Sequence, residues 1–143
     1  MPQQIVKGYR QLIDEAEATI ETVGADEAFR RQDQTDAVLV DLRDIRELQR
    51  EGRIPGAIHC PRGMLEFWID PASPYHKPVF AEDRPFIFFC AAGWRSALAA
   101  GRAAEMGLTP VAHIEGGFGA WNQAGLPVES PAEDASPSPS PKK

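Results

Sequence analysis

The segment that most constrains this chain is the apolar run Phe86–Phe89, which ends on Cys90 and is followed by a short loop containing Gly93. A helical pattern rich in alanine then continues to Met106. An apolar run of this kind is typical of a strand buried on both faces, and a helix directly after it is typical of a parallel α/β sheet. The sequence therefore predicts that Cys90 lies at the carboxyl end of a buried strand, where open α/β sheets form their binding crevice.

Strand and helix patterns alternate along the rest of the chain. Apolar runs at 37–40, 57–60 and 111–114 predict strands, and a short edge strand is expected within 19–23. Helical patterns occupy 25–32, 44–52, 63–69 and 117–124, and the proline-rich stretch 71–85 is expected to form a long loop. This alternation predicts an α/β fold, with an open parallel sheet of about five strands and helices on both faces.

The two ends of the chain are expected to lie outside this sheet. Apolar residues recur at helical spacing from Ile5 to Ile20 and predict an amphipathic N-terminal helix over 1–18, packed on the domain. The α/β domain itself is expected over 19–128. Residues 129–143 are rich in proline and serine and offer little to bury, so they predict a disordered tail.

Net charge and cysteine content exclude several classes of function. The 143 residues carry a formal net charge of −6, which argues against nucleic acid or an anionic membrane as a partner. No apolar run reaches the length of a membrane span. The two cysteines, Cys60 and Cys90, form neither a disulfide framework nor a C-x-x-C pair, so we expect a cytoplasmic protein with no metal and no other cofactor.

Cys90 is the candidate catalytic residue because of its predicted surroundings. The backbone N–H groups of the loop and the N-terminus of the next helix would converge on its sulfur and favour negative charge there. A thiol in such a field ionises readily, and the thiolate is the form that acts as a nucleophile. Cys60 stands beside a short strand and is more typical of a small buried apolar residue.

Three segments resemble motifs of the rhodanese family of sulfurtransferases. Residues 40–44 and 52–59 are similar to its Asp-x-Arg-x-x-x-Glu and Gly-His-Ile-Pro-Gly-Ala motifs, with Arg53 where the family usually has histidine. The loop 90–96, Cys-Ala-Ala-Gly-Trp-Arg-Ser, is similar to the active-site loop, and residues 115–127 are close to the C-terminal signature. The segments keep the family's order and spacing over roughly 19–128, so the resemblance implies a rhodanese-like fold.

The resemblance also implies a sulfurtransferase that works through a persulfide on Cys90. The thiolate would attack the outer sulfur of a small anionic donor such as thiosulfate, and the bound sulfur would pass to cyanide, a small thiol or a protein thiol. Ala91 stands where thiosulfate-specific members often have a basic residue, so the donor stays open. The residues implied to bind substrate are Ala91, Ala92, Gly93, Trp94, Arg95 and Ser96, and the supporting residues are Asp41 and Arg43.

Several of these residues are given individual roles. Gly93 would supply the positive φ that a tight loop requires, and Ser96 is a candidate cap for the following helix. Arg95 either binds a sulfonate or braces the loop through hydrogen bonds to its own backbone or to Asp41. Asp41 is interpreted as a structural hydrogen-bond acceptor, and Arg43 as a surface or ion-pair residue. Trp94 is expected to project from the loop and to gate access.

Two further functions stay open. Cysteine phosphatases related to the rhodanese fold have five residues between cysteine and arginine, whereas residues 91–94 supply four here, a cradle too tight for phosphate. A persulfide carrier, or a rhodanese-like binding module for a protein partner, would turn over small donors poorly. The intact loop argues against the module, and Ala91 with the additional N-terminal helix favours the carrier.

Overall fold

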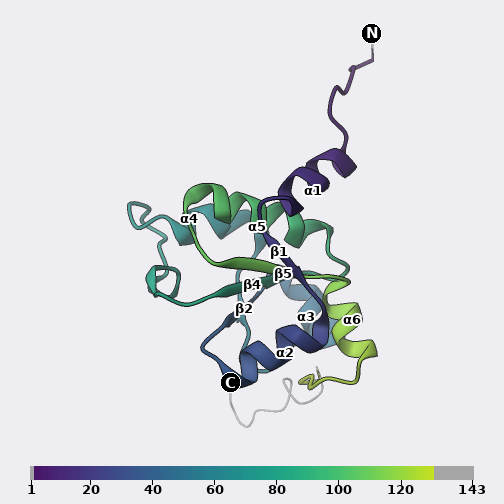
Figure 1. Ribbon diagram of the computed structural model, residues 1–143, viewed down its shortest axis with the longest axis vertical. Helices are drawn as coiled ribbons and strands as arrows, with labels where there is room; N and C mark the ends of the chain where they lie inside the picture. The colour runs from purple at the N-terminus through teal and green to yellow at the C-terminus, as the bar shows by residue number, and fades with distance from the viewer. Residues whose placement is uncertain (1, 131–143) are drawn as a thin grey trace.

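A five-stranded parallel sheet, in the order β1-β5-β4-β2-β3, forms the centre of the computed structural model, which describes residues 2–130 (Figure 1). Every strand pairs in parallel with its neighbours. The prediction of an open parallel sheet is therefore confirmed. The strands are β1 (Glu21–Val23), β2 (Val38–Asp41), β3 (Ile58–His59), β4 (Phe86–Phe89) and β5 (Val111–Ile114).

Helices cover both faces of this sheet (Figure 1). On one face lie α4 (Leu65–Ile69) and α5 (Trp94–Met106), with α1 (Tyr9–Glu17) packed against α5. On the other face lie α2 (Ala25–Gln34), α3 (Ile45–Glu51) and α6 (Gly117–Gln123). Two short 3-10 helices complete the order, η1 (Arg62–Met64) and η2 (Pro78–Ala81), and the second falls inside the stretch predicted as a loop.

The central strand β4 explains why the sequence has a continuous apolar run. All four of its side chains are buried. Phe86 and Phe88 pack with α4 and α5 on one face, whereas Ile87 and Phe89 pack with α2 and α6 on the other. Because successive side chains of a strand point to opposite faces, a strand covered on both sides has no position for a polar residue.

The N-terminal helix begins later than the sequence pattern predicts, at Tyr9, with Gly8 as its N-cap. It packs closely on α5, because a Cβ added to Gly101 would lie 2.7 Å from the Cβ of Ala16. Ile5 and Val6 precede the helix and are exposed. None of the helices in the described part of the chain is both long and apolar enough to cross a membrane.

The tail predicted over 129–143 lies mostly beyond the described residues, which end at Ser130. Glu129, the first residue of that prediction, pairs with Arg53 through two backbone hydrogen bonds of 3.0 and 2.8 Å. At Glu129 the chain thus lies against the connection between α3 and β3.

A buried ion pair between Asp41 and Arg43 lies at the carboxyl end of β2. The guanidinium Nε and Nη2 donate to the two carboxylate oxygens at 3.0 and 2.8 Å, and Nη2 also donates to the carbonyl of Gly52 at 2.9 Å. The guanidinium carbon lies 4.1 Å from the ring centre of Phe118 in α6. Arg43 is therefore an ion-pair residue inside the protein, where it links β2, the end of α3 and α6.

We predict that Asp41→Asn lowers the free energy of unfolding by about 3 kcal/mol, because it leaves the Arg43 guanidinium buried without a countercharge. Urea denaturation measures this loss. The control is Glu82→Gln, which breaks the exposed Glu82–Arg84 pair and should change stability by less than about 0.5 kcal/mol. Equal effects of the two variants would contradict a structural role for the buried pair.

Candidate active site

Cys90 follows the last residue of β4, and two backbone N–H groups point at its sulfur. The N–H of Gly93 donates to Sγ at 3.1 Å and that of Ser96 at 3.4 Å. Gly93 has a φ of 116°, the left-handed conformation that lets the loop turn back over the sulfur. The side chain is almost fully buried, and its sulfur faces the loop and the start of α5.

Backbone N–H groups at the N-terminus of α6 bind the carbonyls of Cys90 and Ala91. The N–H of Phe118 donates to the carbonyl of Cys90 at 2.7 Å, and the N–H of Gly119 donates to that of Ala91 at 3.1 Å. Gly117 has a φ of 57°, and a Cβ there would lie 2.3 Å from the Cys90 carbonyl oxygen. This close approach explains the glycine at 117, whereas a Cβ at Gly116, with a φ of 77°, would lie 2.7 Å from the Cβ of Ala120. Neither role was predicted from the sequence.

Arg95 is braced by Glu47 in α3. Its Nη1 and Nη2 donate to the carboxylate oxygens at 2.8 and 3.0 Å. Of the three alternatives considered for Arg95, the bond to Asp41 is not formed, because Asp41 is occupied by Arg43. Glu47 also accepts from the Asp44 N–H as part of the capping box that begins α3.

The charges of this pair shift both pKa values. The hydrogen bonds from Arg95 lower the pKa of Glu47 to about 2, with smaller contributions from the Asp44 N–H and from the charge of Arg43. The pKa of Arg95 is raised, first by its bonds to Glu47 and also by Cys90. The guanidinium therefore lies close enough to the sulfur to interact with it.

Ser96 does not cap α5, contrary to the expectation. The N-cap is Gly93 and Ser96 is the third residue of the helix, so its hydroxyl points back to the carbonyl of Gly93 at 3.2 Å. The same hydroxyl lies 2.9 Å from Nδ1 of His113 in β5. His113 was not a candidate site residue, because its contact with the loop depends on the order of the strands in the sheet.

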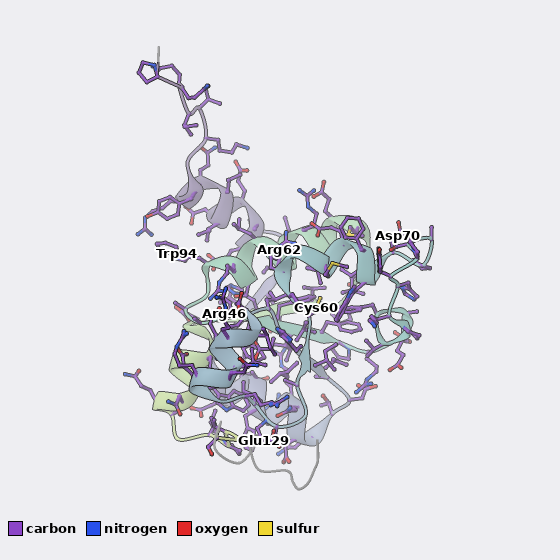
Figure 2. The ribbon with its side chains drawn as sticks, turned by 180° about the vertical axis from the view of Figure 1, so that it is seen from behind. Arg46, Cys60, Arg62, Asp70, Trp94 and Glu129 are labelled. Carbon is purple, nitrogen blue, oxygen red and sulfur yellow. The ribbon has the colours of Figure 1, made fainter. Side chains whose placement is uncertain are left out.

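The outward side of the loop is formed by Ala92 and Trp94, which are exposed, whereas Ala91 is half-buried. Trp94 is the first residue of α5, and its ring lies 4.9 Å from that of Tyr9 in α1. Figure 2 shows Trp94 beside this helix. The indole is 54% exposed, so it borders the approach to the loop without closing it.

A cleft of about 250 Å³ lies beside the loop, between the end of β2 and the start of η1. Arg62 and Arg95 bring two guanidinium groups to it, and Arg62 also pairs with Glu66 at 3.0 Å. A larger cleft of about 490 Å³ separates α1 from α5 and contains no residue of 90–96. The smaller cleft includes one residue of the loop, Arg95. Its lining residues are Leu42, Arg43, Asp44, Pro61, Arg62, Gly63 and Arg95.

The second cysteine lies in a different environment. Cys60 is fully buried in the apolar core, and burial raises the pKa of its thiol to about 12. Within residues 2–130, no group of three or more histidine, cysteine or acidic side chains is arranged to hold a metal ion. Cys90 is therefore the cysteine whose surroundings favour nucleophilic chemistry.

Comparison with known proteins identifies a family. Residues 24–124, which include Cys90 and the supporting segments, match the model of the rhodanese-like domain. A sulfurtransferase from Allochromatium vinosum is 30% identical over 102 residues, covering 71% of this chain and 87% of that protein. A thiosulfate sulfurtransferase from Glaesserella parasuis is 29% identical over 113 residues, covering 79% of this chain and 96% of that protein.

A solved structure from Rhodopseudomonas palustris is also similar. It is 57% identical, with a TM-score of 0.87, and the match covers 90% of this chain and 99% of the other. That protein is described as one of unknown function and as a possible tyrosine phosphatase. The structural similarity therefore extends well beyond residues 24–124. The description of that protein also raises a second activity, that of a tyrosine phosphatase.

We predict that Gly117→Ala lowers the free energy of unfolding by at least about 3 kcal/mol, because a methyl group would overlap the Cys90 carbonyl. Gly125→Ala is the matched control, since Gly125 also has a positive φ of 75° but nothing within 4 Å of its Cβ position. It should lose only about 1 kcal/mol from backbone strain. Similar losses in urea denaturation would show that the close approach has no energetic consequence.

We predict that the loss of stability in Glu47→Gln depends on pH, because the variant cannot form the ion pair with Arg95. Glu47 has its pKa lowered from 4.5 to about 2, so its stabilisation is complete above pH 4.5 and is lost as pH falls through 2. We expect the wild type to exceed the variant by about 2 kcal/mol near neutral pH, allowing for solvent around half-exposed Arg95. The difference in unfolding free energy, measured over pH, should shrink toward zero in acid. A constant difference would assign the effect to the capping box alone.

Proposed function

The chain belongs to the rhodanese-like domain family, and we propose that it is a sulfurtransferase that carries a sulfane sulfur as a persulfide on Cys90. The observation that carries this proposal is the pair of N–H groups, from Gly93 and Ser96, that donate to Cys90 Sγ at 3.1 and 3.4 Å. Hydrogen bonds to sulfur favour its ionised form, and they would favour the charged outer sulfur of a persulfide in the same way.

The reaction consists of two half-reactions. In the first, the Cys90 thiolate attacks the outer sulfur of thiosulfate, a new S–S bond forms, and the S–S bond of the donor breaks to release sulfite. In the second, an acceptor such as cyanide attacks the outer sulfur of the persulfide, and thiocyanate leaves as the thiolate is regenerated. The two steps share a covalent intermediate, so ping-pong kinetics should follow.

The cleft beside the loop supports an anionic sulfur donor. Three arginines, Arg43, Arg62 and Arg95, and one acidic residue, Asp44, line it, so an anion there would experience a local positive field despite the net charge of −6. Each arginine is already paired with a carboxylate. We therefore expect weak binding of thiosulfate, with the acceptor being cyanide, a small thiol or a protein thiol.

A tyrosine phosphatase is the second candidate, because the Rhodopseudomonas palustris protein is described as a possible one. A phosphatase loop must direct N–H groups at the oxygens of a phosphate held above the sulfur. Here two of the loop N–H groups, those of Gly93 and Ser96, are directed at the sulfur itself, and Arg95 is engaged by Glu47. This geometry favours stabilisation of a sulfur anion over recognition of a phosphate.

A persulfide carrier for a protein partner would form the same Cys90 persulfide as a thiosulfate enzyme. It would differ in turning over small sulfur donors poorly. Ala91 and Ala92 follow Cys90, and neither supplies a charge to hold a sulfonate. The exposed rings of Trp94 and Tyr9 border the loop. These features leave a carrier as the alternative outcome of the experiment below.

We predict that thiosulfate treatment of the reduced protein adds one sulfur atom, and that peptide mass spectrometry locates it on Cys90. Cys90→Ser should abolish both this addition and thiocyanate formation from cyanide. Cys60→Ser is the matched control and should retain both, because Cys60 is buried and hard to ionise.

Three outcomes separate the alternatives. Persulfide with rapid thiocyanate formation supports the thiosulfate enzyme, whereas persulfide with negligible turnover supports the carrier. Release of phosphate from an aryl phosphate, lost in Cys90→Ser and without any sulfur uptake, would replace the proposal with the phosphatase.

A further inference from the structure

Glu17, His113 and Ser96 form a continuous chain of hydrogen bonds from α1 to the Cys90 loop. Nε2 of His113 lies 3.0 Å from Oε2 of Glu17, and Nδ1 lies 2.9 Å from Oγ of Ser96. The Ser96 hydroxyl also reaches the carbonyl of Gly93 at 3.2 Å. His113 and Ser96 are buried, whereas the Glu17 side chain is 38% exposed. The chain of bonds therefore runs from the surface into the site.

The donors and acceptors of this chain can be assigned. An ionised Glu17 can only accept, so Nε2 of His113 carries a hydrogen and donates to it. In a neutral ring, Nδ1 then accepts the hydrogen of the Ser96 hydroxyl. In a charged ring, Nδ1 donates to that hydroxyl, and the hydroxyl donates a hydrogen bond to the Gly93 carbonyl. The Ser96 side chain is held by His113 in both states.

Ser96 connects this chain of bonds to the sulfur through its own backbone. The Ser96 N–H donates to Cys90 Sγ. The carbonyl near the Ser96 hydroxyl belongs to Gly93, and the N–H of Gly93 is the second group that donates to Sγ. His113 is a firm anchor because it lies in β5, in register with Phe88 of β4, two residues before Cys90. Ser96 is thus bonded to a side chain of the sheet in both states of the ring. Gly93 is linked as well when the ring is charged, because the single hydrogen of the Ser96 hydroxyl is then donated to the Gly93 carbonyl.

We propose that His113 is a positioning residue for Cys90, and that Glu17 fixes its imidazole from the N-terminal helix. The inference rests on the proposed function only in taking Cys90 as the nucleophile. It assigns to α1 a part in the chemistry, because this helix supplies Glu17. With His113 in place, the first turn of α5 keeps the Ser96 N–H aimed at the sulfur and so favours the thiolate.

The same three residue types occur in serine hydrolases, but that chemistry does not fit this arrangement. Ser96 is completely buried, and its hydroxyl is bonded to the Gly93 carbonyl and to His113. A nucleophilic hydroxyl must reach a substrate carbonyl. Among the described residues of the loop, the nucleophile that this chain of bonds reaches is the sulfur of Cys90, which accepts the Ser96 N–H.

The test is the ultraviolet absorbance of the Cys90 thiolate across the neutral pH range. It is obtained by subtracting, for each variant, the same protein with Cys90→Ser, which removes the background of Cys60. His113→Phe keeps a ring of similar size but has no ring nitrogen. We expect about fivefold less thiolate at neutral pH, the effect of losing roughly one hydrogen bond.

Two further variants separate positioning from packing. His113→Asn places an amide oxygen near the position of Nδ1, so it should restore most of the thiolate by accepting from Ser96. Glu17→Ala should lower the thiolate when His113 is present and have no further effect in His113→Phe. Because Glu17 is half-exposed, its variant is expected to fold even if His113→Phe does not.

Glu15→Ala is the matched control for Glu17→Ala. It removes the same charge from the same helix, but Glu15 pairs with Lys7 and does not contact His113. Equal losses from the two variants would assign the effect to the charge of α1 and overturn the proposal. Wild-type thiolate in Glu17→Ala, or in a folded His113→Phe, would overturn it as well.

The readout does not require sulfur transfer, so the two proposals fail separately. If thiolate depends on His113 and Glu17 but thiosulfate adds no sulfur, the sulfurtransferase proposal fails and the positioning role stands. If Cys90 accepts sulfur and the variants leave its thiolate unchanged, the proposed function stands and the positioning role fails.

Discussion

The buried ion pair between Asp41 and Arg43 is the interaction on which the arrangement of the site depends. Two charges taken out of water destabilise a fold unless their hydrogen bonds are nearly all made. Arg43 meets it at Nε and Nη2, through Asp41 at the end of β2 and the carbonyl of Gly52, and its guanidinium also lies against the ring of Phe118. Its Nη1 is buried without a hydrogen-bond partner and lies 3.8 Å from Glu51. Asp41 is in register with Phe89, the residue before Cys90. The pair therefore fixes the edge of the sheet from which the Cys90 loop leaves.

From that edge, three separate elements hold the loop. The N-terminus of α6 binds the carbonyls of residues 90 and 91, Glu47 of α3 holds Arg95, and His113 of β5 holds Ser96. Each contact acts on a different part of the loop, so the N–H groups of Gly93 and Ser96 need little rearrangement when charge develops on the sulfur. Donors fixed before the reaction stabilise that charge more effectively than donors that must first be oriented.

The sequence predicts those parts of this arrangement that depend on neighbours in the chain. The strand before Cys90, the capping box of Asp44 and Glu47, and the positive φ of Gly93 are local, and the structure has each of them. The partners of Arg95 and Ser96 lie 48 and 17 residues away and depend on which strands are adjacent. Arg43 was interpreted as a surface or ion-pair residue because its burial follows from α6, far along the chain. Pattern and propensity carry no information on such side-chain pairs.

The charges around the loop indicate how the site can be reactive without binding its donor tightly. Two arginines of the cleft, Arg62 and Arg95, each face a carboxylate, so an incoming anion must share them with Glu66 and Glu47. The N–H groups of Gly93 and Ser96 donate to the sulfur and not to a carboxylate. A field made of backbone dipoles acts at the sulfur and falls off within a few ångströms. In the proposed reaction, this field would stabilise the outer sulfur of the persulfide on Cys90. It would therefore stabilise the covalent intermediate more than the bound donor.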